Sequence, residues 1–233
     1  MDYIKLESIT LKYKNIPLFN NLNLKINKGE YVSIIGSNGS GKTTLAHILS
    51  GMIKNFTGNY FFDDALVTEE KLRLTVGILF QNPDNQLVAS IVKNDIAFGL
   101  ENRRVKSFLL MDKMIDEVLH KLNIFNLKNR NVNTLSGGQK QKVAIASILV
   151  LNFDVIILDE ATSMLDPFSR NELMEIMQQL NDEGKTIIHI THHMEESKKA
   201  DRIIVLDKGK IIADGKPKAI FKNKEIIKIA NLT

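Results

Sequence analysis

The sequence predicts an α/β fold with a mostly helical segment inserted into it. Short apolar stretches at residues 31–35 and 155–158 indicate buried strands of a parallel sheet. A glycine-rich loop at residues 36–44 joins the first of these strands to a helical pattern. Between residues 90 and 151 the strand signals stop, and apolar residues recur at helical spacing.

Five strands are predicted before the helical segment, because apolar residues alternate or run together over short stretches bounded by turn residues. In chain order these strands cover residues 3–13, 22–26, 31–35, 58–67 and 76–80. A helix should follow the glycine-rich loop, since Leu45, Ile48 and Leu49 stand at positions i, i+3 and i+4, on one face of a helix.

The helical segment and the C-terminal part complete the predicted architecture. Apolar positions from Met111 to Leu122 indicate one helix, and a second apolar helix runs from Val143. The core resumes at Asp154, with a helix around residues 173–180 and strands at 155–158, 186–190, 203–206 and 210–213. We therefore expect residues 1–89 and 152–233 to form the α/β core, and residues 90–151 to form a helical lobe.

Composition limits the class of protein. The chain of 233 residues is long enough for one large domain or two lobes, and 44% hydrophobic with 25% charged residues is ordinary for a soluble protein. The net charge of +4 comes from scattered lysines, so a nucleic-acid partner is not expected. The chain has no cysteine, no N-terminal signal pattern and no apolar stretch of the ~20 residues that span a bilayer. We expect no disulfide and no membrane crossing by this chain itself.

A phosphate-binding loop is predicted directly after the strand at residues 31–35. It fits the pattern Gly-x-x-x-x-Gly-Lys-Ser/Thr and consists of Gly36, Ser37, Asn38, Gly39, Ser40, Gly41, Lys42, Thr43 and Thr44. Glycines let the backbone N–H groups turn inward, and the following helix adds the positive end of its dipole. Lys42 would contact the outer phosphates, and the Thr43 hydroxyl would ligate Mg²⁺. A chance glycine-rich turn is the alternative, but the match lies between a strand and a helix, as the motif requires.

Two acids follow the apolar strand at residues 155–158. The carboxyl ends of parallel strands lie at the crevice where α/β folds bind ligands. Asp159 is therefore predicted to hold Mg²⁺, and Glu160 to polarise the water that attacks the γ-phosphate. An acid that caps a helix after a core strand is the structural alternative. The complete phosphate loop in the same chain favours the catalytic interpretation.

A second anion-binding helix start is predicted at Ser136, Gly137, Gly138 and Gln139. Ser136 would cap the helix, and the two glycines free the backbone at its N-terminus. Since the first loop already accounts for one nucleotide, this segment is predicted to clamp the γ-phosphate of a nucleotide held by a partner chain. A capped helix alone explains Ser136, but not the two glycines and Gln139 together.

Three single residues at or just after the ends of predicted strands would complete the site. Gln81 would reach Mg²⁺ or the attacking water, His192 would contact the γ-phosphate, and Tyr13 would stack on the base. Each type of residue also has a common structural role. A lone Gln is usually at the surface, a lone His is often a satisfied core residue, and a lone Tyr usually packs.

Together these residues resemble the nucleotide-binding subunit of ABC transporters over nearly the whole chain. The resemblance implies ATP and Mg²⁺ as ligands, and a P-loop NTPase (RecA-like) core with an antiparallel β subdomain and an inserted α-helical subdomain. It assigns Tyr13 to the adenine platform, residues 36–43 to Walker A, Gln81 to the Q-loop, residues 135–139 to the signature loop, residues 155–160 to Walker B, residues 161–166 with Asp166 to the D-loop, and His192 to the switch histidine.

A narrower resemblance lies in residues 80–102, which include the run Asn-Pro-Asp-Asn-Gln at 82–86. This stretch is similar to the A component of energy-coupling factor (ECF) transporters, which take up vitamins and transition-metal ions in prokaryotes. Of their two ATPase types, this run and an intact Glu160 indicate the first. His193 departs from the family, which usually has Asp there.

The ECF resemblance also implies partners. ATP would bind between Walker A of this chain and the signature loop of a second ABC ATPase, expected to be a distinct paralogue in a heterodimer. A membrane T component would dock in the groove near residues 81–87, and S components would be reached indirectly. We expect the chain to lie at the cytoplasmic face of the cell membrane as a peripheral subunit.

Other nucleotide-dependent functions fit the sequence less well. The ATPase of an ordinary ABC importer or of a cobalt or nickel transporter stays open as an alternative, because only residues 82–102 favour the ECF type. A DNA-repair ABC ATPase would carry a long coiled coil between the Q-loop and the signature loop, whereas this span is short here. A translation-type member would carry two nucleotide domains in one chain, whereas this sequence shows one. A GTPase would carry an Asn-Lys-x-Asp motif, which the chain lacks.

Overall fold

The computed structural model describes residues 2–14 and 16–230, with the side chain of Tyr13 outside the description. The chain forms two compact units, which we describe separately. The core unit comprises Met1–Ile78, Asp154–Glu160 and Met174–Thr233. The helical unit comprises Leu79–Phe153 and Ala161–Leu173.

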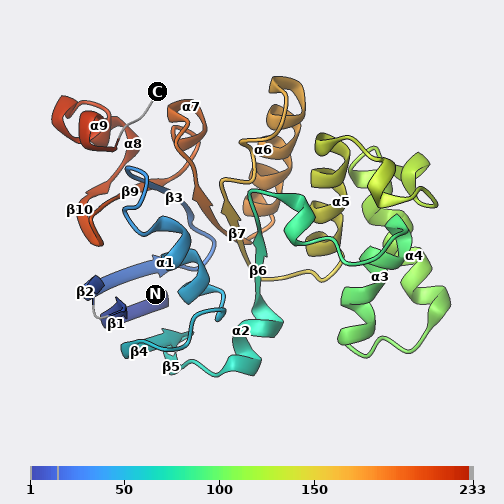
Figure 1. The fold of residues 1–233 in the computed structure, drawn as a ribbon, viewed down its shortest axis with the longest axis horizontal. Coiled ribbons are helices and arrows are strands. Elements are labelled where there is room, and N and C mark those ends of the chain that lie inside the picture. The colour runs from blue at the N-terminus through green and yellow to red at the C-terminus, as the bar shows by residue number, and fades with distance from the viewer. Residues whose placement is uncertain (1, 15, 231–233) are drawn as a thin grey trace. The chain divides into compact units, whose positions relative to one another are not determined.

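A six-stranded sheet forms the centre of the core unit (Figure 1). Its strand order is β10 (Lys210–Gly215), β9 (Arg202–Asp207), β3 (Tyr31–Ile35), β8 (Thr186–Ile190), β7 (Val155–Asp159) and β6 (Val76–Leu79). The pairs β9–β3, β3–β8 and β8–β7 are parallel, whereas β10 is antiparallel to β9. Every residue of β3, β7 and β8 is buried, as expected for central strands covered on both faces.

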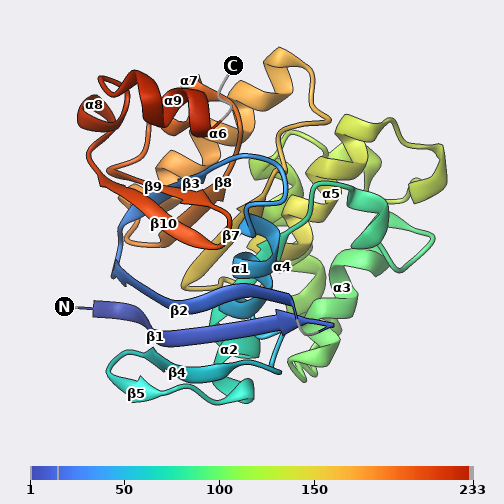
Figure 2. The ribbon, with the colours of Figure 1, turned by 60° about the vertical axis from the view of Figure 1, so that its left-hand side comes forward.

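A second, antiparallel sheet belongs to the same unit. Its order is β2 (Ile16–Asn27), β1 (Asp2–Tyr13), β4 (Thr57–Phe62) and β5 (Ala65–Leu66), and its strands lie side by side in Figure 2. The single strand predicted at residues 58–67 is in fact the hairpin β4–β5. Asp63 and Asp64 form its turn with φ of 56° and 59°, a conformation that Asp tolerates better than most residues.

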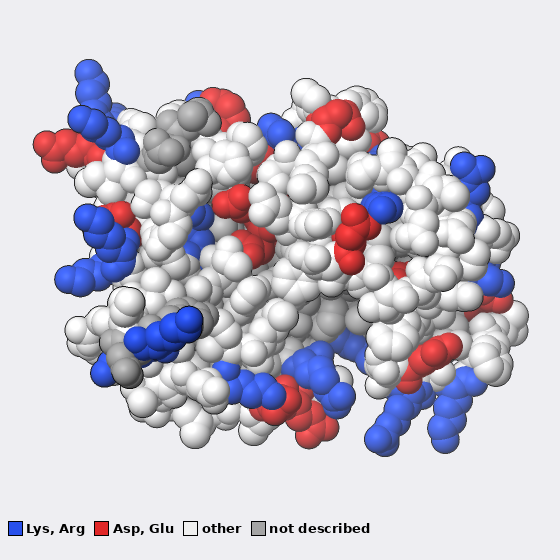
Figure 3. All heavy atoms as spheres, in the orientation of Figure 1, with Lys and Arg blue, Asp and Glu red and all other residues white. Residues whose placement is uncertain are grey.

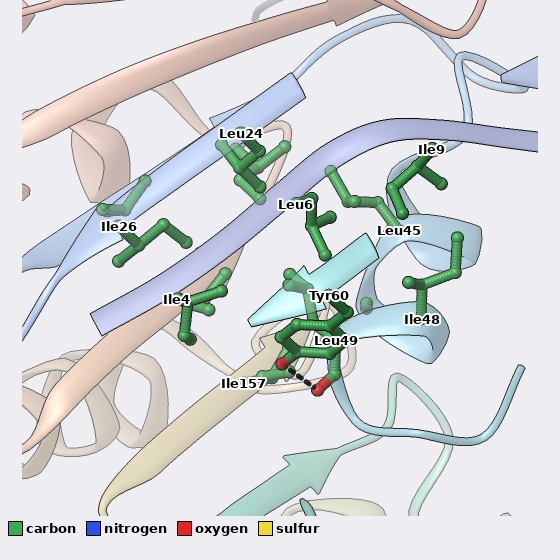
Figure 4. Close-up of a cluster of buried hydrophobic side chains, with 14 of the residues drawn as sticks. Ile4, Leu6, Ile9, Leu24, Ile26, Leu45, Ile48, Leu49, Tyr60 and Ile157 are labelled. Atoms are coloured by element: carbon green, nitrogen blue, oxygen red, sulfur yellow. Dashed lines mark hydrogen bonds between the residues drawn. The ribbon is translucent and has the colours of Figure 1, made fainter. Parts of the chain in front are cut away.

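Helix α1 (Lys42–Leu49) packs against both sheets and so fixes the phosphate loop that precedes it. Leu45, Ile48 and Leu49 are fully buried in one cluster with side chains of β1, β2 and β7 (Figure 4). The hydroxyl of Tyr60 donates a hydrogen bond of 2.9 Å to the carbonyl oxygen of Leu49 at the end of the helix. Burial of this helix therefore holds the loop in place.

Four short helices of the core unit were not predicted from the sequence. They are α2 (Glu69–Thr75), α7 (Met194–Ser197), α8 (Pro217–Ile220) and α9 (Lys224–Ala230). Ile220 of α8 and Ala230 of α9 pack on Ile35, Ile203 and Val205 of the central sheet. Helix α6 (Pro167–Asp182) begins in the helical unit and ends in the core unit, and it extends the predicted helix in both directions.

The helical unit contains α3 (Val92–Asn102), α4 (Phe108–Lys121) and α5 (Gly137–Leu149), with short 3-10 turns between them. Helix α4 covers the predicted helical stripe, and α5 begins directly after Ser136. Within residues 2–14 and 16–230, no helix is both long and apolar enough to span a bilayer. On the face shown in Figure 3, basic side chains lie in several separate groups and do not form one large basic patch.

Candidate nucleotide-binding and hydrolysis site

The loop between β3 and α1 has a backbone that requires glycine. A Cβ atom at Gly36 would lie 2.0 Å from the carbonyl oxygen of Leu206, so no side chain fits there. Gly39 has a φ of 79°, and a Cβ atom built on it would meet nothing within 4 Å. The loop is thus closed against β9 on one side and open on another.

Ser37 and Ser40 fasten this loop to the turn after β9. The Ser37 hydroxyl donates to Oδ1 of Asp207 at 3.1 Å, and the N–H of Gly209 donates to the carbonyl oxygen of Ser40 at 2.9 Å. Within the described part of the chain, the buried Ser40 hydroxyl has no hydrogen-bond partner. Since buried hydroxyls are rarely left unpaired, this one fits a site that is completed by a polar ligand.

Lys42 lies inside the loop rather than in solvent. Its side chain is only 6% exposed, and Nζ donates to the carbonyl oxygens of Gly36 at 2.8 Å and Ser37 at 3.1 Å. Burial lowers the pKa of Lys42, while the nearby Glu160 and Asp159 act in the opposite direction. The ammonium group is therefore held at the loop, where the outer phosphates of a nucleotide would lie.

Thr43 and Asp159 form an oxygen pair beside the loop. The Thr43 hydroxyl donates to Oδ1 of Asp159 at 3.1 Å, although the two residues come from different elements, α1 and β7. Burial raises the pKa of Asp159, and the hydrogen bond from Thr43 partly offsets this. Hydroxyl and carboxylate oxygens are the ligands that Mg²⁺ prefers, so the pair fits this ion.

Glu160 and His192 face each other at the ends of β7 and β8. Oε2 of Glu160 lies 3.8 Å from Nδ1 of His192, and the N–H of Glu160 donates to the carbonyl oxygen of Ile190 at 3.0 Å. Glu160 has a φ of 51°, which is strained for a residue other than glycine. His192 is 39% exposed, and its ring packs on His193 with centroids 4.2 Å apart.

The remaining predicted residues of the core unit are Asn38, Thr44 and Tyr13. Asn38 is exposed and Thr44 is half-buried in the first turn of α1. Tyr13 ends β1, but its side chain lies outside the described residues, so its place at the base stays a prediction.

The signature segment in the helical unit is built around a capping box. The Ser136 hydroxyl accepts from the N–H of Gln139 at 3.3 Å, and the Gln139 side chain accepts from the N–H of Ser136 at 3.0 Å. The capping box thus gives Gln139 as well as Ser136 a structural role, but it does not account for Gly137 and Gly138. Gly137 is exposed with open space where a side chain would be, and Gly138 is half-buried.

Two more predicted residues belong to the helical unit. Gln81 is exposed and follows β6, which ends at Leu79 and not at Phe80 as predicted. Oδ1 of Asp166 accepts from the N–H groups of Phe168 and Ser169 at 3.0 and 3.1 Å, and hydrogen bonds from Ser169 lower its pKa. Asp166 therefore caps α6 in addition to any role at a nucleotide.

The 3-10 turn after Gln81, Pro83–Asn85, is joined to the signature helix α5 within the helical unit. Asp84 pairs with Nζ of Lys140 at 2.7 Å, and Nε2 of Gln86 donates to the carbonyl oxygen of Ala144 at 3.4 Å. Lys140 follows Gln139 directly, so this ion pair lies one residue beyond the signature segment.

Several residues that contact the phosphate loop or the residues around His192 carry no signal in the sequence. Asp207, which accepts from Ser37, is an ordinary acid at the end of a strand, and no local pattern marks it. The buried residues Thr191 and Glu196 next to His192 were missed for the same reason. Their partners lie in other elements or one helical turn away, and sequence spacing does not reveal them.

Comparison with known proteins identifies the family of the chain. The family model described as "ABC transporter" matches residues 19–163. A relative from Mycoplasmopsis synoviae, named energy-coupling factor transporter ATP-binding protein EcfA1, is 44% identical over 98% of this chain and 88% of its own length. The protein of the same name from Clostridioides difficile is 43% identical over 97% of this chain and 84% of its own length.

Solved structures agree. The structure of cbiO1 from Clostridium perfringens, described as part of the ABC transporter complex cbiONQ, is 36% identical, with a TM-score of 0.85 over 99% of this chain and 95% of its own. The ATP-binding cassette MJ0796, solved as a dimer in a post-hydrolysis state with ADP and Pi, is 30% identical, with a TM-score of 0.84 over 92% of this chain and 98% of its own. The predicted α/β fold of the P-loop NTPase type is confirmed. The chain is a nucleotide-binding ABC ATPase, and it belongs to the family of energy-coupling factor transporter ATP-binding proteins.

Proposed function

We propose that this chain is the first-type A component of an ECF transporter, and that it hydrolyses ATP with Mg²⁺ at an interface with a second ABC ATPase. The main support is the grouping of Lys42, Thr43, Asp159, Glu160 and His192 at the carboxyl ends of β3, β7 and β8. The energy-coupling factor relatives give the transporter context.

In this proposal the loop at residues 36–44 binds the phosphates. Its backbone N–H groups and the Lys42 ammonium contact the phosphate oxygens, and Tyr13 stacks on the adenine. Thr43, Asp159 and Gln81 would hold Mg²⁺, whose charge offsets that of the β- and γ-phosphates.

Two side chains then act on the γ-phosphate. Glu160 accepts a hydrogen bond from the attacking water and orients it for in-line attack. His192, 3.8 Å from Glu160, contacts the γ-phosphate oxygens and stabilises their charge. Together they confine the water between a carboxylate and the phosphoryl group.

The signature segment serves the nucleotide of the partner ATPase. Ser136, Gly137, Gly138 and Gln139 present the N-terminus of α5 to its γ-phosphate, and Asp166 lies in the same interface. We expect the partner to be a distinct paralogue. Loss of the γ-phosphate removes this contact and reopens the pair.

The membrane T component docks near residues 81–87 and carries the S components, with this chain peripheral at the cytoplasmic face. The ion pair of Asp84 with Lys140 connects residues 81–87 to the start of α5, so a movement of the docking segment would also displace the signature segment. The naming of cbiO1 as part of a complex supports such an assembly.

The transporter context is tested by purifying the tagged chain from native membranes in mild detergent. We expect a related ATPase, one polytopic T protein and several small S proteins to co-purify. Two transmembrane subunits with a dedicated binding protein would show an ordinary importer instead. ATP hydrolysis in a preparation without any membrane protein would contradict the role in transport and leave only the ATPase activity.

The role of Glu160 is tested by Glu160→Gln, with Glu117→Gln on the exposed face of α4 as the matched control. Loss of the carboxylate should lower kcat by about 10²-fold or more, because the water is no longer oriented by a base. ATP affinity should stay within about twofold, since uniform binding contacts are kept. Steady-state hydrolysis near the wild-type rate in Glu160→Gln would contradict the assignment.

A further inference from the structure

A cluster of buried polar side chains lies beneath the loop that carries His192. Its members come from β3, β8, α7 and the loop between them, and are Tyr31, Ser33, His189, Thr191, Glu196 and Ser197, all at most 5% exposed. Buried polar groups destabilise a fold unless they are hydrogen-bonded, so the arrangement of their bonds shows what the cluster holds.

Thr191 bonds to residues on the far side of His192. Its hydroxyl donates to Oε2 of Glu196 at 2.5 Å and accepts from the N–H of His193 at 3.0 Å. The N–H of Thr191 donates to the carbonyl oxygen of Ile34 in β3 at 3.3 Å. The backbone N–H groups of Thr191 and His193, the residues on either side of His192, are thus both bonded, although the His192 ring itself is partly exposed.

Ser197 bonds to the backbone carbonyl group of His193. The Ser33 hydroxyl of β3 donates to the Ser197 hydroxyl at 3.1 Å, which in turn donates to the carbonyl oxygen of His193 at 3.2 Å. Both backbone groups of His193 are therefore bonded to side chains. The turn from β8 into α7 is joined to β3 at this point and also through Thr191.

Glu196 also lies next to His189 of β8. Nε2 of His189 lies 3.4 Å from Oε2 of Glu196, and Nδ1 of His189 lies 3.4 Å from the hydroxyl of Tyr31. Burial lowers the pKa of His189 to about 4, so its imidazole is neutral near pH 7. Within the described residues, Nε2 of His189 makes no hydrogen bond, so its 3.4 Å approach to Glu196 is a contact only.

We infer that Thr191 and Glu196 are positioning residues for His192, and that they hold the turn around it so that its imidazole meets the γ-phosphate. This inference rests on the role of His192 in the proposed function. Neither residue touches the reacting atoms in the proposal. Their effect on hydrolysis passes through His192, because a displacement of about 1 Å at a reacting group can change a rate strongly.

The test compares Thr191→Val with Thr186→Val in the assembled ATPase pair. Thr186 is an equally buried Thr at the other end of β8, and its hydroxyl accepts from the N–H of Gly29 at 2.9 Å. Both changes remove the hydrogen bonds of a buried hydroxyl and should lower the melting temperature. Only Thr191→Val should lower kcat, by about tenfold, with KM for ATP within about twofold. Thr191→Ser, which keeps the hydroxyl, should restore most of the rate.

A double-mutant cycle with His192→Ala separates positioning from a general structural effect. In the His192→Ala background, Thr191→Val should lower kcat by less than about twofold, because its effect passes through the missing imidazole. Equal losses in both backgrounds, or an equal loss of kcat in Thr186→Val, would overturn the inference. Wild-type turnover in His192→Ala would instead remove His192 from the proposed function, and the inference with it.

Should Thr191→Val fail to fold, Glu196→Gln gives the same comparison, since it keeps the shape of the side chain and removes its charge. We expect Glu196→Gln to lower kcat at unchanged KM. In the His192→Ala background, Glu196→Gln should not lower kcat further. Wild-type kcat in Glu196→Gln, or a loss that persists on His192→Ala, would count against the inference.

Discussion

Lys42 and Asp159 are both buried, and burial disfavours the charged form of each side chain. Burial lowers the pKa of Lys42 and raises that of Asp159. Glu160 adds a backbone conformation that costs of the order of 1–3 kcal/mol elsewhere in proteins. At residue scale, the site therefore gives up stability for function.

Asp159→Asn should raise the melting temperature of the metal-free chain. A raised pKa in the folded state means that the protonated form stabilises the fold below the unfolded pKa, and that this stability is lost as pH rises through the folded pKa. At neutral pH the ionised carboxylate is thus destabilising, and Asn removes this effect. Thermal unfolding in EDTA at pH 7 measures it, with Asp63→Asn in an exposed turn as the control.

The same variant should lose hydrolysis and any stabilisation by Mg²⁺, because a neutral amide is a weaker ligand than a carboxylate. A metal-free melting temperature below that of wild type would show that Asp159 stabilises the fold instead.

At the scale of elements, sequence patterns predicted the central strands best. Strands β3 and β8 match their predicted bounds, because both faces of each strand are buried and most of their residues are apolar. The short helices α7 and α8 were missed, since four residues are too few for a periodic pattern. They form because packing on the sheet stabilises them, and packing partners are distant in sequence.

Ser136→Ala should destabilise the chain by about 1 kcal/mol, since it removes the cap of α5. Ser107 caps α4 in the same unit with a bond of 3.3 Å from the N–H of Leu110, so Ser107→Ala is the matched control. Denaturant unfolding should give similar losses for both variants. Only Ser136→Ala should also slow hydrolysis by the assembled ATPase pair, and equal hydrolysis in the two variants would contradict its assignment to the nucleotide.

At the scale of the whole molecule, the site joins residues that are far apart in the chain. Thr43 and Asp159 are 116 positions apart, and Ser37 and Asp207 are 170 apart. The motifs predicted a role in Mg²⁺ binding for Thr43 and Asp159, and a parallel sheet brings such strand ends together. The distances, the strained φ of Glu160 and the partner Asp207 depend on tertiary packing, so the sequence alone could not supply them.

Nucleotide binding should stabilise the folded chain by mass action. With ATP and Mg²⁺ at about 100 times the dissociation constant, the free energy of unfolding should rise by about 2.7 kcal/mol. Lys42→Ala should lose most of this rise at the same ATP concentration, because the buried ammonium is removed. Lys113→Ala, at an exposed position of α4, should keep it. A full nucleotide shift in Lys42→Ala would contradict the role of Lys42.

The left-handed backbone at Glu160 has a consequence for directed evolution of this ATPase. Gly, Asn and Asp adopt a φ near 51° more easily than Glu does. A library screened for heat resistance alone should therefore enrich Glu160→Gly and Glu160→Asn, and each would yield a robust but inactive protein. Selection that also demands turnover will retain Glu160, so improvements in heat resistance must come from positions outside the site.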